Sequence, residues 1–564
     1  MAAPSSIPVD LSAAFVMAPS TLGDWLVILP PALMICAGAV LMTVRHRIHL
    51  HGWIAIPALV LLLLVDFALL VKVVAGGPVT MTMGRWLPPF GIAFTVDLFG
   101  ALMCFAAGLV ALAAGIGALK DINASGRRYG FFPFLMLLMA GVSGAFLTGD
   151  IFNLYVWFEV LLISSFGLLV LGSEREQIDG ALKYAILNLI GTTLFLIAVG
   201  YLYGVFGTLN MADIALRARE IEGAPLMTLS ALFVLAFAMK AASFPVNFWL
   251  PASYHTPRIT VSALFGGLLT KVGIYALMRV MVMLFPLQRE ELSLLIGVLA
   301  ALTLIIAALG MLAQDDIRRV AGYAVIVGIG NMLAGIAVGT VAGLTGALLY
   351  ALHSILAMTA LYLVFGRAAA ISGSVSLTKG GGIYRLAPGF AFASLALFLA
   401  VSGLPPFSGL WPKIMLVKAS LDIGAWWLAA AILLSGFLTT IALARVFLFA
   451  YWRPAQALPL AQPGAMTQPG AMTQPAAMTQ PEAVAQPEAR AQVRSQLGGD
   501  AAAAPAAALR STPAETWPLF ALIAIITVFG LFPELPLSLS QSAAEGLVNP
   551  AAYIQSVFPQ GPAP

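Results

Sequence analysis

Long apolar runs, separated by short polar stretches, dominate the pattern along this chain and predict a bundle of membrane helices. A helix crosses a bilayer with about 20 apolar residues, and runs of roughly that length occur about 14 times. We expect these spans near residues 24–44, 53–75, 97–119, 131–149, 151–171, 180–206, 226–249, 257–285, 292–313, 318–339, 342–371, 388–420, 425–451 and 516–534. The predicted fold class is therefore an all-α polytopic membrane protein.

Composition supports this prediction and excludes several classes of function. Of the 564 residues, 61% are hydrophobic and 9% are charged, whereas soluble domains carry about 25% charged residues. The net charge of +4 is small and no run of basic residues is interleaved with aromatic ones, so we expect no nucleic-acid partner. Cys36 and Cys104 lie in apolar runs and predict neither a disulfide framework nor a metal site. Without a phosphate-binding loop, zinc motif or nucleophile elbow, the sequence predicts no cofactor and no enzyme active site.

Lysine and arginine gather in alternate loops, and this bias predicts the orientation of the chain. The residues concerned are Arg45, Arg47, Lys120, Arg127, Arg128, Arg318, Arg319, Arg367, Lys379, Arg385, Arg453, Arg490, Arg494 and Arg510. Their loops are expected to face the cytoplasm, so both termini should face the periplasm or exterior of a multi-pass protein in the inner membrane. His46, His49 and His51 share the first of these loops, where we expect an exposed basic segment rather than a metal site.

One stretch, residues 240–257, combines charge with helix-breaking residues. Lys240 ends an uncharged apolar run, Pro245 and Pro251 follow, and the next predicted helix carries Lys271. Proline removes a backbone donor, and a membrane helix can break only where protein or a wet cavity satisfies the freed groups. A lysine near the bilayer centre costs about 2.5–3.5 kcal/mol. Two interpretations are open: an ion or proton site at a helix break, or a lysine that snorkels or forms a static ion pair.

A second break is predicted in residues 400–413, which contain three prolines and end at Lys413. Broken spans seven and twelve, at corresponding positions of two halves, predict inverted repeats; two unrelated proline-rich kinks are the alternative. The expected organisation is three N-terminal helices in 1–130, repeats in 131–285 and 286–452, a disordered cytoplasmic linker in 453–515, and a final span with a C-terminal tail in 516–564.

Other ionisable residues are candidates for the same pathway. Glu159 lies about 12 Å into span five and forms, with a lysine, either a titrating couple or a static pair. His353 in span eleven is either a proton relay, since imidazole titrates near neutral pH, or a hydrogen-bonded structural residue. His255, at the first break, is a candidate gate. Asp150 is expected to cap span five at the membrane surface, and Lys183 to lie at the membrane interface.

Four segments together resemble a known family: Gly149–Ser165, Lys240–Pro257, Leu268–Arg279 and Gly403–Lys413. They are similar to the antiporter-like subunits shared by Mrp-type cation/proton antiporters and respiratory complex I, and their local forms resemble the D-type Mrp subunits more than the complex I subunits. The resemblance implies 14 helices with broken helices seven and twelve. It also implies a polar axis across the membrane, made by Glu159, Lys240, Lys271, His353 and Lys413.

The resemblance implies a function in ion transport, and three forms of it are open. The first is a proton-translocating subunit of a multi-subunit antiporter that exchanges protons for Na⁺ or another monovalent cation, a secondary transporter with other membrane subunits as partners. The second is a proton-pumping membrane-arm subunit of a quinone oxidoreductase or membrane-bound hydrogenase. The third is a structural subunit without transport, because Ala324 and Met358 are less polar than the family pattern.

Overall fold

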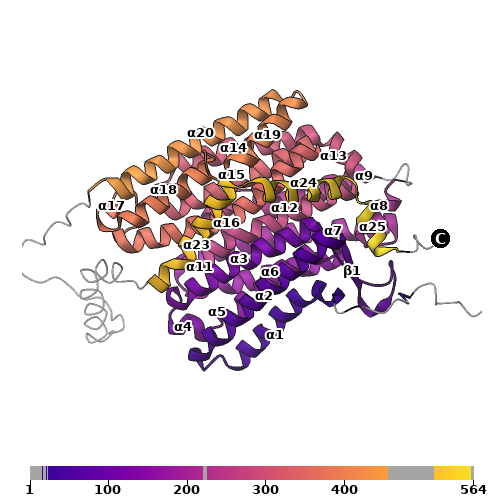
Figure 1. The fold of residues 1–564 in the computed structure, drawn as a ribbon, viewed down its shortest axis with the longest axis horizontal. Helices are drawn as coiled ribbons and strands as arrows, with labels where there is room; N and C mark the ends of the chain where they lie inside the picture. Colours follow the sequence, from indigo (N-terminus) through magenta and orange to yellow (C-terminus); the bar gives the residue numbers. More distant parts are fainter. Residues whose placement is uncertain (1–14, 17–20, 22, 220–224, 455–512, 560–564) are drawn as a thin grey trace, which may run out of the picture.

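The computed structural model describes residues 15–16, 21, 23–219, 225–454 and 513–559, which form a bundle of long helices (Figure 1). Nine helices among these described residues are long and apolar enough to cross a membrane. They are α2 (Ile48–Gly76), α3 (Leu98–Asp121), α6 (Ile151–Leu169), α7 (Arg175–Phe206), α14 (Ser293–Ala313), α15 (Ile317–Val338), α16 (Val341–Ser372) and two composite helices, Ile259–Leu284 and Trp426–Trp452. The predicted all-α membrane fold is confirmed.

The composite helices each contain π-helical turns. The first consists of α11 (Ile259–Leu264), the π-helical η4 (Phe265–Leu269), α12 (Thr270–Met278) and the π-helical η5 (Arg279–Leu284). The second joins α20 (Trp426–Val446) to the π-helical η6 (Phe447–Trp452). Such widened turns are rare inside α-helices and recur at functional sites.

Four further apolar helices are shorter, namely α1 (Leu29–Thr43), α5 (Phe131–Leu147), α9 (Leu226–Ala241) and α18 (Pro388–Ser402). A helix of 15–17 residues rises about 23–26 Å, less than the roughly 30 Å of a hydrocarbon core. As the prolines predict, α9 and α18 are continued beyond a break by the short helices α10 (Trp249–Ser253) and α19 (Leu410–Asp422). The count of about 14 spans stays a prediction.

The remaining elements are short and lie mostly at the ends of the bundle. They are η2 (Asp24–Val27), η3 (Met83–Arg85), α4 (Ala124–Arg128), α8 (Met211–Arg217), α13 (Pro286–Glu291), α17 (Ile383–Leu386), and the antiparallel strands β1 (Val79–Thr82) and β2 (Ala93–Val96). In Figure 1, α4 and α17 lie at one end, and β1 and α8 at the other.

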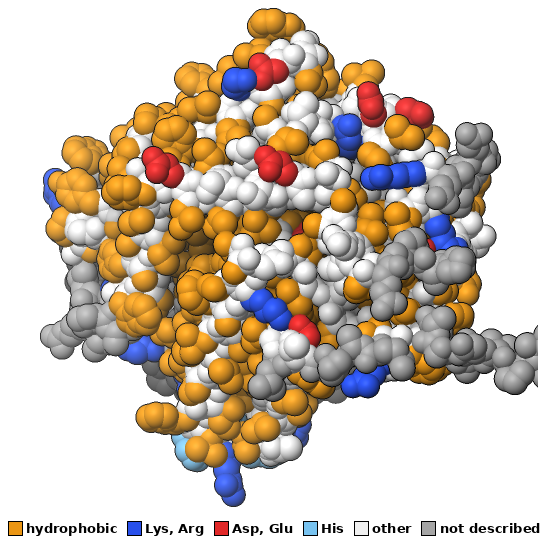
Figure 2. Space-filling model, turned by 45° about the vertical axis from the view of Figure 1, so that its right-hand side comes forward, with side chains coloured by type: hydrophobic (Ala, Val, Ile, Leu, Met, Phe, Trp, Pro, Cys, Tyr) orange, Lys and Arg blue, Asp and Glu red, His pale blue; other side chains and the backbone are white. Residues whose placement is uncertain are grey.

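The centre of the bundle is formed by the first composite helix, α15 and α16, which are almost wholly buried. By contrast, α2, α7 and the second composite helix turn much of their apolar surface outward. Helices that are apolar all round suit either a protein interior or lipid. The face drawn in Figure 2 is accordingly dominated by hydrophobic side chains, with few charged ones, some of which lie as neighbours of opposite sign.

The C-terminal helices lie across the bundle. The helix α23 (Pro513–Leu531) precedes α24 (Glu534–Val548) at a bend of 79°, and α24 packs on both α3 and α16. The segment predicted as a C-terminal tail is therefore helical over α24 and α25 (Ala551–Val557). Most of the predicted linker, residues 455–512, lies outside the described residues.

One prediction about the first loop is wrong. Because α2 begins at Ile48, His49 and His51 are helical. His51 is fully buried and meets the ring of Phe132 in α5 edge-on, at 6.1 Å between centroids. The packing of α5 over the start of α2 thus removes His51 from the exposed basic segment.

Candidate functional site

The two helix breaks share one backbone geometry. The left-handed residue Ala242 (φ 60°) follows α9, and the left-handed residue Gly403 (φ 82°) follows α18. In both cases the next helix begins seven residues later, at Trp249 and at Leu410. A left-handed residue ends a helix and redirects the chain, although Ala242, unlike glycine, carries a Cβ that opposes this conformation. This match adds to the prediction of two repeats.

Side-chain donors bind backbone carbonyl groups at both breaks, which helps to keep the backbone paired as a membrane requires. The indole Nε1 of Trp249 donates to the carbonyl oxygen of Met239 at 3.3 Å. The ammonium group of Lys413 donates to the carbonyl oxygen of Ser402 at 2.6 Å. The two lysines differ in position, since Lys240 precedes its break and Lys413 follows its own.

Lys240 lies in the last turn of α9 and is 7% exposed. Its Nζ is 5.4 Å from the ring centroid of Phe158 in α6, a cation–π distance. Glu159 acts on Lys240 electrostatically, but the ion pairs within 4.0 Å in the described part of the chain do not include these two. Glu159 is half-buried and shares a hydrogen bond with Tyr155. The two side chains predicted to form a couple thus influence each other across a distance and form no direct ion pair.

A small cavity adjoins Lys240. Its volume is about 20 Å³, room for about one water molecule. It is lined by Phe158, Leu161, Leu162, Tyr184, Asn188, Lys240, Trp249, Tyr254 and Leu269. The Tyr184 hydroxyl bonds to Ser165 at 2.6 Å, whereas the Tyr254 hydroxyl has no hydrogen-bond partner among the described residues. The cavity therefore offers one water a polar position beside the ammonium group.

Lys271 is fully buried in α12, and its ammonium group donates to the carbonyl oxygen of Gly266 at 2.6 Å. Gly266 belongs to the π-helical η4, so the lysine is bound by a widened turn of its own helix. Two residues further, Gly273 packs on the first break, where a Cβ would lie 3.3 Å from the carbonyl carbon of Lys240. The helix α12, which contains Lys271, is therefore packed against the end of α9.

His353 connects the central helix α16 to the second break. It is fully buried, and its Nδ1 lies 2.8 Å from the hydroxyl oxygen of Ser408. Its Nε2 has no partner within the described ranges. Lys271 and Lys413 both act on His353 electrostatically. The structure therefore brings the second half of the predicted axis together around this imidazole.

The three accessory candidates lie away from this buried set. Asp150 caps α6 by accepting the backbone N–H of Asn153 at 2.8 Å, as predicted. His255 lies 3.2 Å from a guanidinium nitrogen of Arg319 and links the first break to the start of α15. The side chain of Lys183 is 51% exposed and pairs with an aspartate of its own helix, which fits the interfacial position predicted for it.

Two positions predicted to lower the polarity of the second half are buried and apolar in the structure. Ala324 in α15 is 2% exposed and Met358 in α16 is fully buried. Both helices belong to the centre of the bundle. Neither side chain can add a polar group to this half, where His353, Ser408 and Lys413 are among the buried residues that form hydrogen bonds.

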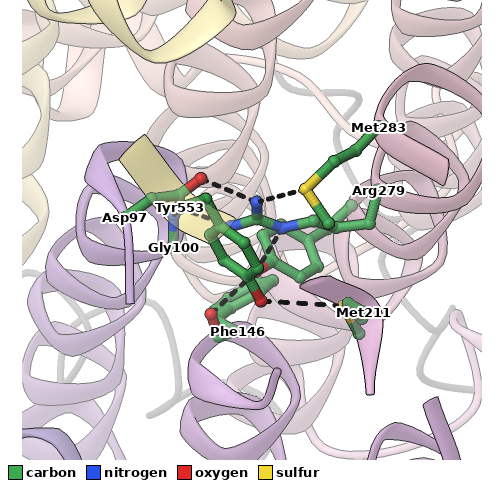
Figure 3. A network of polar contacts seen from close by, with 8 residues as sticks. Asp97, Gly100, Phe146, Met211, Arg279, Met283 and Tyr553 are labelled. Carbon is green, nitrogen blue, oxygen red and sulfur yellow. Dashed lines mark hydrogen bonds and ion pairs between the residues drawn. The ribbon is translucent and has the colours of Figure 1, made fainter. Parts of the chain in front are cut away.

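An ionic network at the end of α12 was missed in the sequence (Figure 3). Arg279, 1% exposed, forms a bidentate ion pair with Asp97, the N-cap of α3. Its Nε donates to the Tyr275 hydroxyl at 3.0 Å, and its guanidinium carbon lies 5.4 Å from the ring centroid of Tyr553 in α25. Lys271, Tyr275 and Arg279 recur every fourth residue, a spacing that places them on one helix face. This four-residue spacing of polar side chains was the feature of the sequence from which the network could have been predicted.

Sequence comparison with known proteins agrees with this architecture. The family model described as NADH:quinone oxidoreductase/Mrp antiporter, TM, matches residues 148–439. The D subunit of the Na(+)/H(+) antiporter of Alkalihalophilus pseudofirmus is 38% identical over 428 residues, which are 76% of this chain and 87% of that protein. The protein of the same name from Bacillus subtilis is 35% identical over 434 residues, 77% of this chain and 88% of that one.

Solved structures share the fold. A chain of the Mrp complex from Dietzia sp. DQ12-45-1b matches with a TM-score of 0.80 at 28% identity, covering 96% of this chain and all of that one. A chain of respiratory complex I from Thermus thermophilus matches with a TM-score of 0.73 at 22% identity, covering 93% and 100%, which is a likeness of fold alone. The predicted resemblance is confirmed, and the chain belongs to the NADH:quinone oxidoreductase/Mrp antiporter family.

Proposed function

We propose that this chain is a proton-translocating subunit of a multi-subunit antiporter that exchanges protons for Na⁺ or another monovalent cation. The observation that carries the proposal is a series of three buried lysines, Lys240, Lys271 and Lys413, none of which has a direct carboxylate partner among the described residues. A buried ammonium without a counter-ion is costly, and the loss of its proton removes that cost. Three such groups in one bundle suit proton transfer better than structural support.

The proposed route follows the contacts of the site. Glu159 influences Lys240 through charge, and the cavity beside Lys240 offers a water position toward the middle of the bundle. Lys271 and Lys413 both act electrostatically on His353, which would be the next group on the route. Carbonyl oxygens bind Lys271 and Lys413, so each lysine has an acceptor that stabilises its ammonium form between transfers.

The position of Glu159 supports a neighbouring subunit. On α6 it shares one face with exposed apolar side chains, namely Phe152 (42% exposed), Val156 (39%), Ile163 (66%) and Phe166 (40%). A carboxylate near the middle of a span is costly against lipid. We therefore place another membrane subunit of the same complex against this face. The name of the Dietzia assembly, an Mrp complex, fits such an arrangement.

The proposal is tested by cation-driven proton exchange in vesicles from an antiporter-deficient host. Glu159→Gln and Lys240→Ala should each abolish exchange while the complex still assembles, because each removes one charge of the pair. Glu159→Asp should keep part of the activity, since its charge stays and its reach shortens by one methylene. Lys183→Ala is the matched control, since that lysine is exposed. Normal exchange by an assembled Lys240→Ala complex would make Lys240 structural and refute the mechanism.

The proposed location is the inner membrane, with both termini outside and the end that carries α4 and α17 in the cytoplasm. Single cysteines at Ser125 in α4 and at Phe90 near the opposite end, both exposed, test this in a Cys36→Ser background. An impermeant maleimide should label Phe90→Cys in intact cells and Ser125→Cys only after permeabilisation. The reverse pattern would invert the topology.

The alternative, a membrane-arm subunit of a quinone oxidoreductase, has a weaker basis. The match to the complex I chain is at 22% identity and concerns the fold. The two relatives described above, at 38% and 35% identity, are named antiporter subunits. Purification of the tagged chain separates the two: co-purifying iron–sulfur or flavin subunits would favour the oxidoreductase, and small membrane subunits alone would favour the antiporter.

A further inference from the structure

A second buried carboxyl group lies outside the lysine series, on α2. Asp66 is 1% exposed, and neither of its carboxylate oxygens has a hydrogen-bond partner in the described part of the chain. It lies about 27 Å of helix rise from Ile48 and about 15 Å from Gly76, the two ends of α2. The carboxyl is therefore well inside the predicted span. In the sequence, this site is recognisable as a single carboxylate within a long apolar run.

The helices around Asp66 offer no counter-charge at its level. The helices α1 and α5 contain no Asp, Glu, Lys, Arg or His, and the one cysteine of α1, Cys36, is exposed. Cys104 of α3 is buried and interacts electrostatically with Asp66. The other titratable groups of α2 and of the elements packed on it lie toward helix ends: Asp24, His49, His51, Lys72, Asp97, Lys120, Asp121, Arg127 and Arg128. Of these, Lys72 is already paired with Asp24 at 3.0 Å.

The carboxyl of Asp66 occupies a niche between α2 and α3. Gly108 of α3 lies directly against the carboxyl, since a Cβ at that position would be 2.8 Å from Oδ2 of Asp66. Cys104 lies one helical turn before Gly108 and borders the same niche. A glycine at the contact leaves just enough space for the carboxyl, so the fit depends on the close approach of the two helices.

Neither charge state of Asp66 is stabilised in this niche. An ionised carboxylate without donors is strongly disfavoured in apolar surroundings, and a protonated one still leaves its O–H without an acceptor. A leucine at this position would avoid both costs, and an ionisable group inside a span is a functional candidate by default. We propose that Asp66 is a proton-binding site. It holds a proton while α2 and α3 are packed as observed. When these two helices separate and water reaches the carboxyl, Asp66 releases the proton to that water and becomes a carboxylate.

Infrared difference spectroscopy of the assembled complex in vesicles, stepped between acidic and alkaline pH, tests this site directly. The wild type should show the C=O stretch of a protonated carboxyl that disappears at alkaline pH, and Asp66→Asn should lack that band. Asp24→Asn is the matched control, because it removes an ion-paired carboxyl beside the same helix and should leave the band in place. Gly108→Ala places a methyl against Oδ2 and should shift the band, which keeps the test usable if Asp66→Asn fails to assemble.

Two results would overturn the proposal. A band that persists unchanged to alkaline pH would make Asp66 a permanently neutral structural residue. The absence of any band that depends on Asp66 and Gly108 would show that Asp66 carries no proton. The measurement does not depend on antiport, so a failure of the proposed transport pathway would leave the outcome at Asp66 unaffected.

Discussion

Removal of the Asp97 carboxylate should be among the most damaging single changes outside the lysine series. Asp97→Ala leaves the guanidinium of Arg279, which is 1% exposed, without its charge partner. It also removes the N-cap of α3, because Oδ1 accepts the backbone N–H of Gly100 at 3.0 Å. The hydroxyl of Tyr275, 3.0 Å from Nε of Arg279, remains as a partner but carries no charge.

The expected magnitude follows from these contacts. Breaking a buried ion pair by removing one partner costs about 3–5 kcal/mol, and loss of a helix cap adds about 1 kcal/mol. The guanidinium keeps the rings of Phe99, Tyr275 and Tyr553, whose centroids lie 5.1–5.4 Å away, and each such contact contributes about 0.5–2 kcal/mol. These ring contacts are present in the wild type as well, so they do not change the difference between the two proteins. We expect Asp97→Ala to lose about 4–6 kcal/mol of unfolding free energy, the sum of the ion-pair and cap costs.

A double-mutant cycle measures this coupling. Unfolding of the purified chain in detergent is compared for wild type, Asp97→Ala, Arg279→Met and the double variant. The double variant should be more stable than Asp97→Ala, because it removes the orphaned charge. The control is Asp422→Ala, whose pair with Lys418 is exposed and worth less than about 1 kcal/mol. Equal losses for Asp97→Ala and Asp422→Ala, with no gain in the double variant, would refute the reasoning.

Three further changes follow from single contacts. Gly530→Val should weaken assembly, measured by size-exclusion chromatography, because a Cβ there collides with the Pro406 carbonyl oxygen, whereas Gly546→Val, in open space, should not. Ser408→Ala should slow exchange in vesicles without loss of assembly, because it removes the partner of His353; an unchanged rate would remove Ser408 from the pathway. Hydrogen bonds, led by that of the Ser376 hydroxyl, lower the pKa of the Asp315 carboxyl below its unfolded value. The stabilisation is therefore present above the unfolded pKa and is lost as pH falls through the folded one. Asp315→Asn should lower the melting temperature at pH 7, and the difference should shrink at acidic pH; a constant difference would contradict this linkage.

The sequence predicted features that depend on local chemistry and missed those that depend on packing. Prolines beside Lys240 and Lys413 located both helix breaks, because a proline acts on its own turn of helix. The outward position of Glu159 could not be predicted. Its helix is almost uniformly apolar, so the hydrophobicity of its faces differs too little to show which face is exposed. Asp97 and Arg279 pair across 182 residues of sequence, and their contact exists only once the composite helix Ile259–Leu284 is packed beside α3.

The difference between the two breaks bears on how the site works. At the second break, Lys413 is bound to a carbonyl of the break itself and lies in a buried environment shared with His353. At the first break, Lys240 rests on an aromatic ring beside a cavity, and its charge partner Glu159 lies on the outer face of the chain. A charge pair separated by a distance and partly open to a neighbour is sensitive to that neighbour, because the neighbour changes both the solvation and the separation of the charges. We therefore propose that coupling to another subunit takes place at the Glu159–Lys240 pair, and that the more enclosed second half passes the proton on.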